Sequence, residues 1–77
     1  MSLVYIKGED CFGEKVTVVV PWEAILGVEI VPGAESEIHY SRGADGVQFM
    51  VVSEEYADNF VREWGKHTSW VREADYR

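Results

Sequence analysis

The hydrophobic pattern changes its period once, within residues 47–65, which read VQFMVVSEEYADNFVREWG. In residues 47–52 apolar side chains alternate in the manner of a β-strand. After Ser53 they recur at the spacing of one helical face, a stripe made of Tyr56, Ala57, Phe60, Val61 and Trp64. Ser53 is a favourable N-cap, and Gly65 is a common residue just beyond a helix end. We therefore predict a strand over residues 47–52 and an amphipathic helix over residues 53–65.

The chain before this stretch has the composition of a β-sheet. It contains 12 Val and 4 Ile against 2 Leu in the whole sequence, and β-branched residues favour strands. Turns rich in glycine and proline separate the apolar runs. The predicted strands are residues 3–7, 15–20, 28–31 and 36–41. The run 15–20 is almost continuously apolar, which indicates a central strand or one buried on both faces.

Together these elements predict an α+β fold. We expect a small antiparallel sheet of four to five strands, with the amphipathic helix packed on one face and a short final helix over residues 69–76. A chain of 77 residues, 47% of them hydrophobic, builds one core. Residues 1–77 are therefore expected to form a single domain.

The charge restricts the classes of partner. Acidic residues number 14 against 7 basic ones, for a net charge of −7, which opposes direct binding to nucleic acid or to an anionic membrane. The first 38 residues hold seven acidic and two basic residues, so this half carries most of the negative charge. A field of one sign attracts a partner of opposite charge. We predict a protein partner with a basic surface; the alternative is that the charge only maintains solubility.

The predicted binding residues combine acidic side chains with an aromatic anchor. The acidic residues provide long-range attraction, and Trp22 or Tyr40 is the side chain expected to lose water at the interface. The set is Glu9, Asp10, Glu14, Trp22, Glu23, Glu29, Glu37 and Tyr40. Phe49, Phe60 and Trp64 are instead predicted to join the sheet to the helix in the core.

The sequence contains no signature of an enzyme. HExxH, paired CxxC and phosphate-loop motifs are all missing from it. Glu35, Glu37 and His39 have the spacing of one strand face, which suits Mn, Fe or Zn or an acid/base pair, but a solvated polar face has the same pattern. We therefore predict no catalytic role, no cofactor and no metal site.

The single cysteine, Cys11, allows no intramolecular disulfide and suits a reducing compartment. Its acidic neighbours oppose the thiolate form, so a thiol nucleophile is not expected. The N-terminal residues lack the apolar stretch of a signal peptide, and no apolar run is long enough to span a membrane. We predict a cytoplasmic protein. Free strand edges make a homodimer the alternative to a heterologous partner.

Two resemblances accompany these predictions. The segment 20–29, VPWEAILGVE, and the passage from Phe49 to Phe60 resemble the strand–bend–strand and the strand-to-helix parts of small bacterial pleckstrin-homology-like domains. The chain lacks the basic patch of lipid-binding members, so this resemblance implies architecture only. In size, acidity and lack of catalytic motifs it also resembles phage-encoded inhibitors such as anti-CRISPR proteins, which implies an inhibitor that occludes a basic, nucleic-acid-binding surface.

Overall fold

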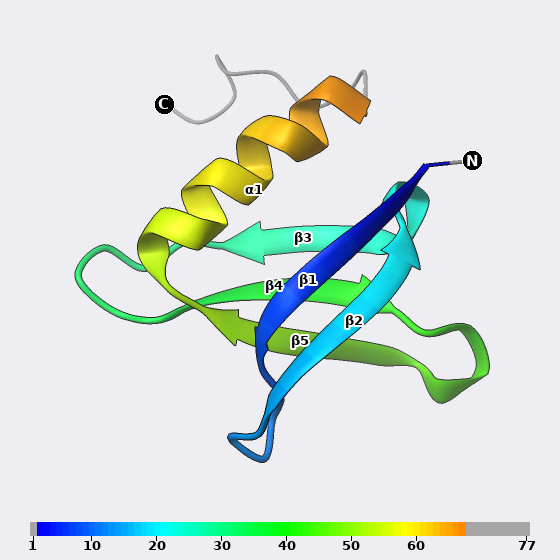
Figure 1. The fold of residues 1–77 in the computed structure, drawn as a ribbon, viewed down its shortest axis with the longest axis horizontal. Coiled ribbons are helices and arrows are strands. Elements are labelled where there is room, and N and C mark those ends of the chain that lie inside the picture. Colours follow the sequence, from blue (N-terminus) through cyan, green and yellow to red (C-terminus); the bar gives the residue numbers. More distant parts are fainter. Residues whose placement is uncertain (1, 68–77) are drawn as a thin grey trace.

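A computed structural model describes residues 2–67 and shows a five-stranded antiparallel sheet with one α-helix (Figure 1). The elements in chain order are β1 (Leu3–Glu9), β2 (Lys15–Pro21), the 3-10 turn η1 (Trp22–Ala24), β3 (Ile25–Glu29), β4 (Ser36–Ser41), the 3-10 turn η2 (Gly43–Asp45), β5 (Val47–Val52) and α1 (Glu54–His67). The predicted α+β class is confirmed. The predicted final helix over residues 69–76 lies outside the described residues.

The sheet is strongly bent because its two parts share little hydrogen bonding. The strand order is β2-β1-β5-β4-β3. β1 and β2 pair along their whole length, whereas β1 meets β5 only where Glu9 lies opposite Val51. The β1–β2 hairpin therefore diverges from β5 and runs obliquely across β3, β4 and β5 (Figure 1).

The core lies between the hairpin and the other three strands, with α1 covering one side. Ile6 from β1, Ile38 from β4 and Met50 from β5 are fully buried there. The helix adds Ala57, Phe60 and Trp64, all members of the stripe predicted from the sequence. Burial of this stripe is what stabilises a 14-residue helix in a domain this small.

Hydrogen bonds fix the start of α1 against the sheet. Ser53 Oγ accepts from the Tyr56 amide at 3.1 Å, which confirms the predicted N-cap. The Tyr56 hydroxyl accepts from the Lys7 amide of β1 at 3.0 Å, and Glu54 Oε1 accepts from the Gly33 amide at 2.9 Å. The first helical turn is thereby tied to both β1 and the loop between β3 and β4.

Two predictions about element position are wrong. β2 is an edge strand with one exposed face, and not a central or doubly buried one: Val20 is buried while its neighbour Val19 is exposed. The helix also continues past Gly65 to His67. The His67 ring stacks on Trp22 with centroids 4.6 Å apart, a tertiary contact that outweighs the weak helix propensity of glycine.

The predicted strand 28–31 is displaced as well. The observed strand β3 begins at Ile25, directly after η1, and ends at Glu29. Ile25 is buried in the core, which holds the chain extended from that residue onward.

Candidate protein-binding face

The alternation of the strands separates the core from an outward surface. In β4 and β5 the even-numbered residues Ile38, Tyr40, Met50 and Val52 are buried. Their odd-numbered neighbours therefore point away from the core. We define the acidic face as the outward side chains of β3, β4 and β5, namely Glu29, Glu37, His39, Val47, Phe49 and Val51.

The register of the sheet gathers acidic residues into one row. Glu29 lies opposite Glu37, Glu37 opposite Val51, and Val51 opposite Glu9. Directly opposed side chains in neighbouring antiparallel strands have Cβ atoms about 5 Å apart. Three of the six predicted acidic residues, which are up to 28 positions apart along the chain, are thus brought onto one outward row.

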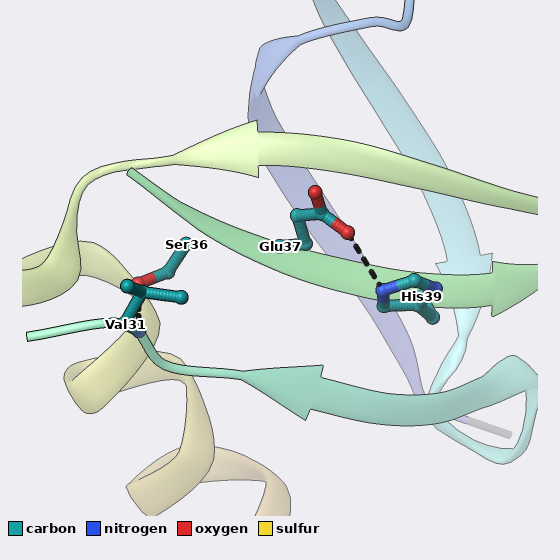
Figure 2. Close-up of polar contacts among 4 residues, drawn as sticks. All are labelled: Val31, Ser36, Glu37 and His39. Carbon is teal, nitrogen blue, oxygen red and sulfur yellow. Dashed lines mark hydrogen bonds and ion pairs between the residues drawn. The ribbon is translucent and has the colours of Figure 1, made fainter. Parts of the chain in front are cut away.

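His39 joins the carboxylates on this face. Figure 2 shows Glu37 and His39 projecting from the same side of β4, with Glu37 Oε1 3.0 Å from His39 Nε2. Both side chains are partly exposed. The Phe49 ring lies beside the imidazole, with centroids 5.8 Å apart. Phe49 is therefore half-buried on the outer face, which corrects its prediction as a residue joining sheet to helix.

The position of Glu29 is held by the turn that follows β3. Ser36, fully buried at the start of β4, accepts a hydrogen bond from the Val31 amide at 3.1 Å (Figure 2). A turn follows in which the Ala34 amide donates to the Val31 carbonyl and Gly33 has φ of 75°. This geometry leaves Glu35 in the exposed loop before β4, so it is Glu29 that shares the face with Glu37 and His39.

The acidic face is unbalanced in charge. None of the strands β3, β4 and β5 contains a lysine or an arginine. Its apolar part includes Val47, which is 65% exposed. An outward surface with two adjacent carboxylates and accessible apolar side chains suits a basic, partly apolar partner surface.

The remaining acidic residues predicted for binding lie elsewhere. Asp10 has a local role in the turn between β1 and β2, where its Oδ1 accepts from the Phe12 amide at 2.9 Å and the Glu14 amide at 3.0 Å. Glu14 is exposed in that same turn. Glu23 lies in η1, at the opposite end of the hairpin.

Trp22 and Tyr40 are not surface anchors, which corrects that part of the prediction. Trp22 is 8% exposed and packs between Phe60, at a centroid distance of 5.3 Å, and His67. Tyr40 is 2% exposed on the inner side of β4. Tyr40 is buried because side chains alternate along β4, so that it shares the inner side with Ile38. Trp22 is buried because the turn η1 directs its ring beneath α1.

The exposed apolar residues of the β1–β2 hairpin were missed by sequence reasoning. Leu3 and Tyr5 are 53% and 63% exposed, and Tyr5 lies opposite the exposed Val19. We call Leu3, Tyr5 and Val19 the hairpin patch. Residues 3–6 are all apolar, so the sequence does not show which of their side chains face water. The charged Lys7 indicates it, because Lys7 lies on the same strand face as Tyr5 and Leu3.

An open pocket of about 620 Å³ lies between the hairpin and the start of α1. Side chains of both charges line it, including Lys7, Lys15, Glu9 and Glu35, together with Val16. Acidic and basic residues of this lining are direct neighbours in the sheet, since Glu9 of β1 lies opposite Lys15 of β2. The pocket therefore has no excess of one charge, unlike the acidic face.

Comparisons of the chain with models of known protein families, with curated proteins and with solved structures found no match. Within residues 2–67, α1 is neither long nor apolar enough to cross a membrane.

Proposed function

We propose that the chain is a small protein-interaction module without catalytic activity, which binds a partner protein through the acidic face. The observation that supports this proposal is the pairing of Glu29 with Glu37 beside exposed apolar side chains, on three strands without lysine or arginine. Because Trp22 and Tyr40 are buried, Val47 and Phe49 take the place of the apolar anchor that the sequence analysis assigned to them.

Charge and apolar contact have separate parts in this binding. The carboxylates accelerate the encounter with a basic surface, an effect that salt screens. Val47 and Phe49 supply apolar area that is removed from water after contact. The partner class that fits is a protein whose basic surface holds nucleic acid, which the bound module would occlude as an inhibitor. The exposed thiol of Cys11 suits a cytoplasmic setting.

The test compares two double variants with equal changes in charge. Glu29→Gln with Glu37→Gln removes the two carboxylates of the face. Glu23→Gln with Glu55→Gln removes two exposed carboxylates from η1 and α1. Wild type and both variants serve as baits, and captured proteins are eluted by rising salt. We expect wild type and the control variant to retain the same basic protein, and the acidic-face variant to lose it.

Association rates of the purified partner complete the test. The acidic-face variant should bind more slowly and with a weaker dependence on salt. Equal capture by all three baits, or an equal loss in the two variants, would show that position on the sheet is irrelevant and that the charge serves solubility.

A second candidate function, self-assembly, is favoured by the hairpin patch. Within residues 2–67, β2 pairs with β1 alone, and Leu3, Tyr5 and Val19 lie next to its other edge. An unpaired strand edge can extend its sheet with a second copy. Sedimentation of the pure protein should then show a dimer that Tyr5→Thr with Val19→Thr dissociates. Val47→Thr changes an exposed valine of the acidic face, outside the hairpin patch, and should leave the dimer intact. A monomeric wild type rejects this candidate.

A further inference from the structure

In place of the sequence-based prediction of no metal site, we propose that Glu29, Glu37 and His39 form a binding site for a divalent transition metal ion such as Zn²⁺. This inference goes beyond the proposed interaction function and does not depend on it, because the ion would bind the isolated chain.

The strand pairing supplies the geometry of the site. Glu29 and Glu37 are directly opposed on β3 and β4, and His39 follows Glu37 two residues later on the same face. One ligand atom from each of the three lies within 4.8 Å of the others. Two donors that share one zinc ion at about 2.1 Å each are no more than about 4.2 Å apart. Small rotations of the partly exposed side chains are therefore enough to bring all three atoms onto one ion.

The donor set selects the class of ion. One imidazole nitrogen and two carboxylate oxygens suit Zn²⁺, and also Mn²⁺ or Fe²⁺, rather than a thiophilic ion. Glu37 Oε1 and His39 Nε2, now 3.0 Å apart, would exchange their mutual contact for bonds to the ion. A bound cation would also relieve the repulsion between the two opposed carboxylates, which no lysine or arginine of β3, β4 or β5 offsets.

The site is packed against a ring on one side and open on the other. The Phe49 ring lies beside the imidazole on the β5 side. On the β3 side, the residue opposite His39 is Gly27, and a Cβ built there meets no atom within 4 Å. Three protein ligands leave the fourth position of a tetrahedral ion for water or for a side chain of a partner protein.

The experiment is a calorimetric titration of the pure protein with zinc chloride. It uses a Cys11→Ser background, because the exposed thiol of Cys11 is itself a zinc ligand. We expect one zinc ion per chain and a higher melting temperature with zinc. His39→Ala and Glu29→Gln should each weaken binding by about tenfold or more, a loss typical of impaired metal sites. Circular dichroism checks that each variant is folded.

Glu35→Gln is the matched control, since Glu35 has the sequence spacing of a ligand but lies in the loop. It should leave the zinc affinity unchanged. Co²⁺ then reports the ligands directly: its visible absorption should indicate nitrogen and oxygen donors and change in His39→Ala. Absence of zinc binding, full affinity in His39→Ala, or equal weakening by Glu35→Gln and Glu29→Gln would each overturn the proposal. Partner capture repeated with a chelator keeps this outcome separate from that of the proposed interaction.

Discussion

At the scale of single residues, Gly8 is the position where the bend of the sheet depends on a missing side chain. A Cβ built on Gly8 lies 2.6 Å from the Val51 carbonyl oxygen and 2.9 Å from Val52 Cγ1. β1 therefore approaches β5 closely at the one point where the two strands pair. Any side chain at residue 8 has to push the hairpin away from β5.

We predict that Gly8→Ala lowers the free energy of unfolding by about 1–3 kcal/mol, the usual cost of overpacking. Gly27→Ala is the control, since open space surrounds that position; it should be neutral or stabilise by up to about 1 kcal/mol. Urea denaturation of both variants measures the difference. Equal stability of the two variants would mean that β1 and β5 do not need this close approach.

Tyr40 makes the free energy of unfolding depend on pH in the alkaline range. Burial raises the pKa of its hydroxyl above the ordinary 10.0, with smaller increases from the charges of Asp10 and Cys11 and an opposing effect of Arg42. Because the pKa in the folded state is higher than in the unfolded state, the folded state holds the proton more tightly. This contribution to stability is complete below pH 10.0 and is lost as the pH rises through the folded-state pKa.

Tyr40→Phe removes the titrating group while keeping the ring. We predict that urea denaturation between about pH 9 and pH 11 shows a smaller decrease in stability for the variant than for wild type. All other titratable groups are the same in both proteins, so the difference between the two stability profiles isolates the contribution of Tyr40. Identical pH profiles would contradict the burial of its hydroxyl.

At the scale of elements, α1 is positioned by its first turn. The Ser53 side chain caps the Tyr56 amide, and Tyr56 in turn accepts from the Lys7 amide of β1. Glu54 and Glu55 lie at the positive end of the helix dipole. Loss of the cap is therefore expected to loosen both the helix and its attachment to the sheet.

We predict that Ser53→Ala costs about 1 kcal/mol of stability. Ser53→Asp retains an acceptor oxygen and adds a favourable charge at the N-terminus, so it should remain close to wild type. Chemical denaturation followed by far-ultraviolet circular dichroism gives both values. If alanine and aspartate behaved alike, the cap would have no part in holding α1.

At the scale of the whole molecule, one thin core holds two crossed groups of strands and a helix. Met50 is fully buried at its centre, while Val47, three residues earlier on the same strand, is 65% exposed. Domains are stable by only about 0.05–0.15 kcal/mol per residue. A single large cavity therefore removes a considerable part of the total stability of a 77-residue chain.

We predict that Met50→Ala destabilises the fold by about 2–5 kcal/mol, through lost apolar contacts and the cavity that remains. Val47→Ala should change stability by no more than about 0.5 kcal/mol. Thermal melting monitored by tryptophan fluorescence compares them, since Trp22 and Trp64 are both buried in this core. A similar melting temperature for the two variants would place the core elsewhere.

Prediction from the sequence succeeded where the pattern is local. β4 and β5 have the predicted bounds, because polar and apolar residues alternate clearly in both. The helix stripe and the Ser53 cap follow from spacing and side-chain chemistry within one or two turns. Prediction failed at Phe49, whose face on β5 was misassigned: Val47, Phe49 and Val51 alternate correctly, but both faces of that strand contain apolar residues.

The candidate site was predictable only in part. Glu37 and His39 are two residues apart on one strand, so their shared face follows from alternation alone. Glu29 is different, because its place opposite Glu37 depends on how the turn at Gly33 sets the register of two strands. Sequence spacing pointed instead to Glu35, which the same turn leaves in the loop.

The element types, the amphipathic helix and the excess of negative charge follow from the sequence, since propensity, periodicity and composition are properties of neighbouring residues. Which apolar residues are exposed depends instead on how the elements pack together. Tyr5 and Val19 are exposed because β2 is an edge strand and the hairpin presents one face to the core. Trp22 is buried because Phe60 and His67, some 40 positions later, pack against it. Such contacts depend on strand order and long-range packing, which local patterns do not encode.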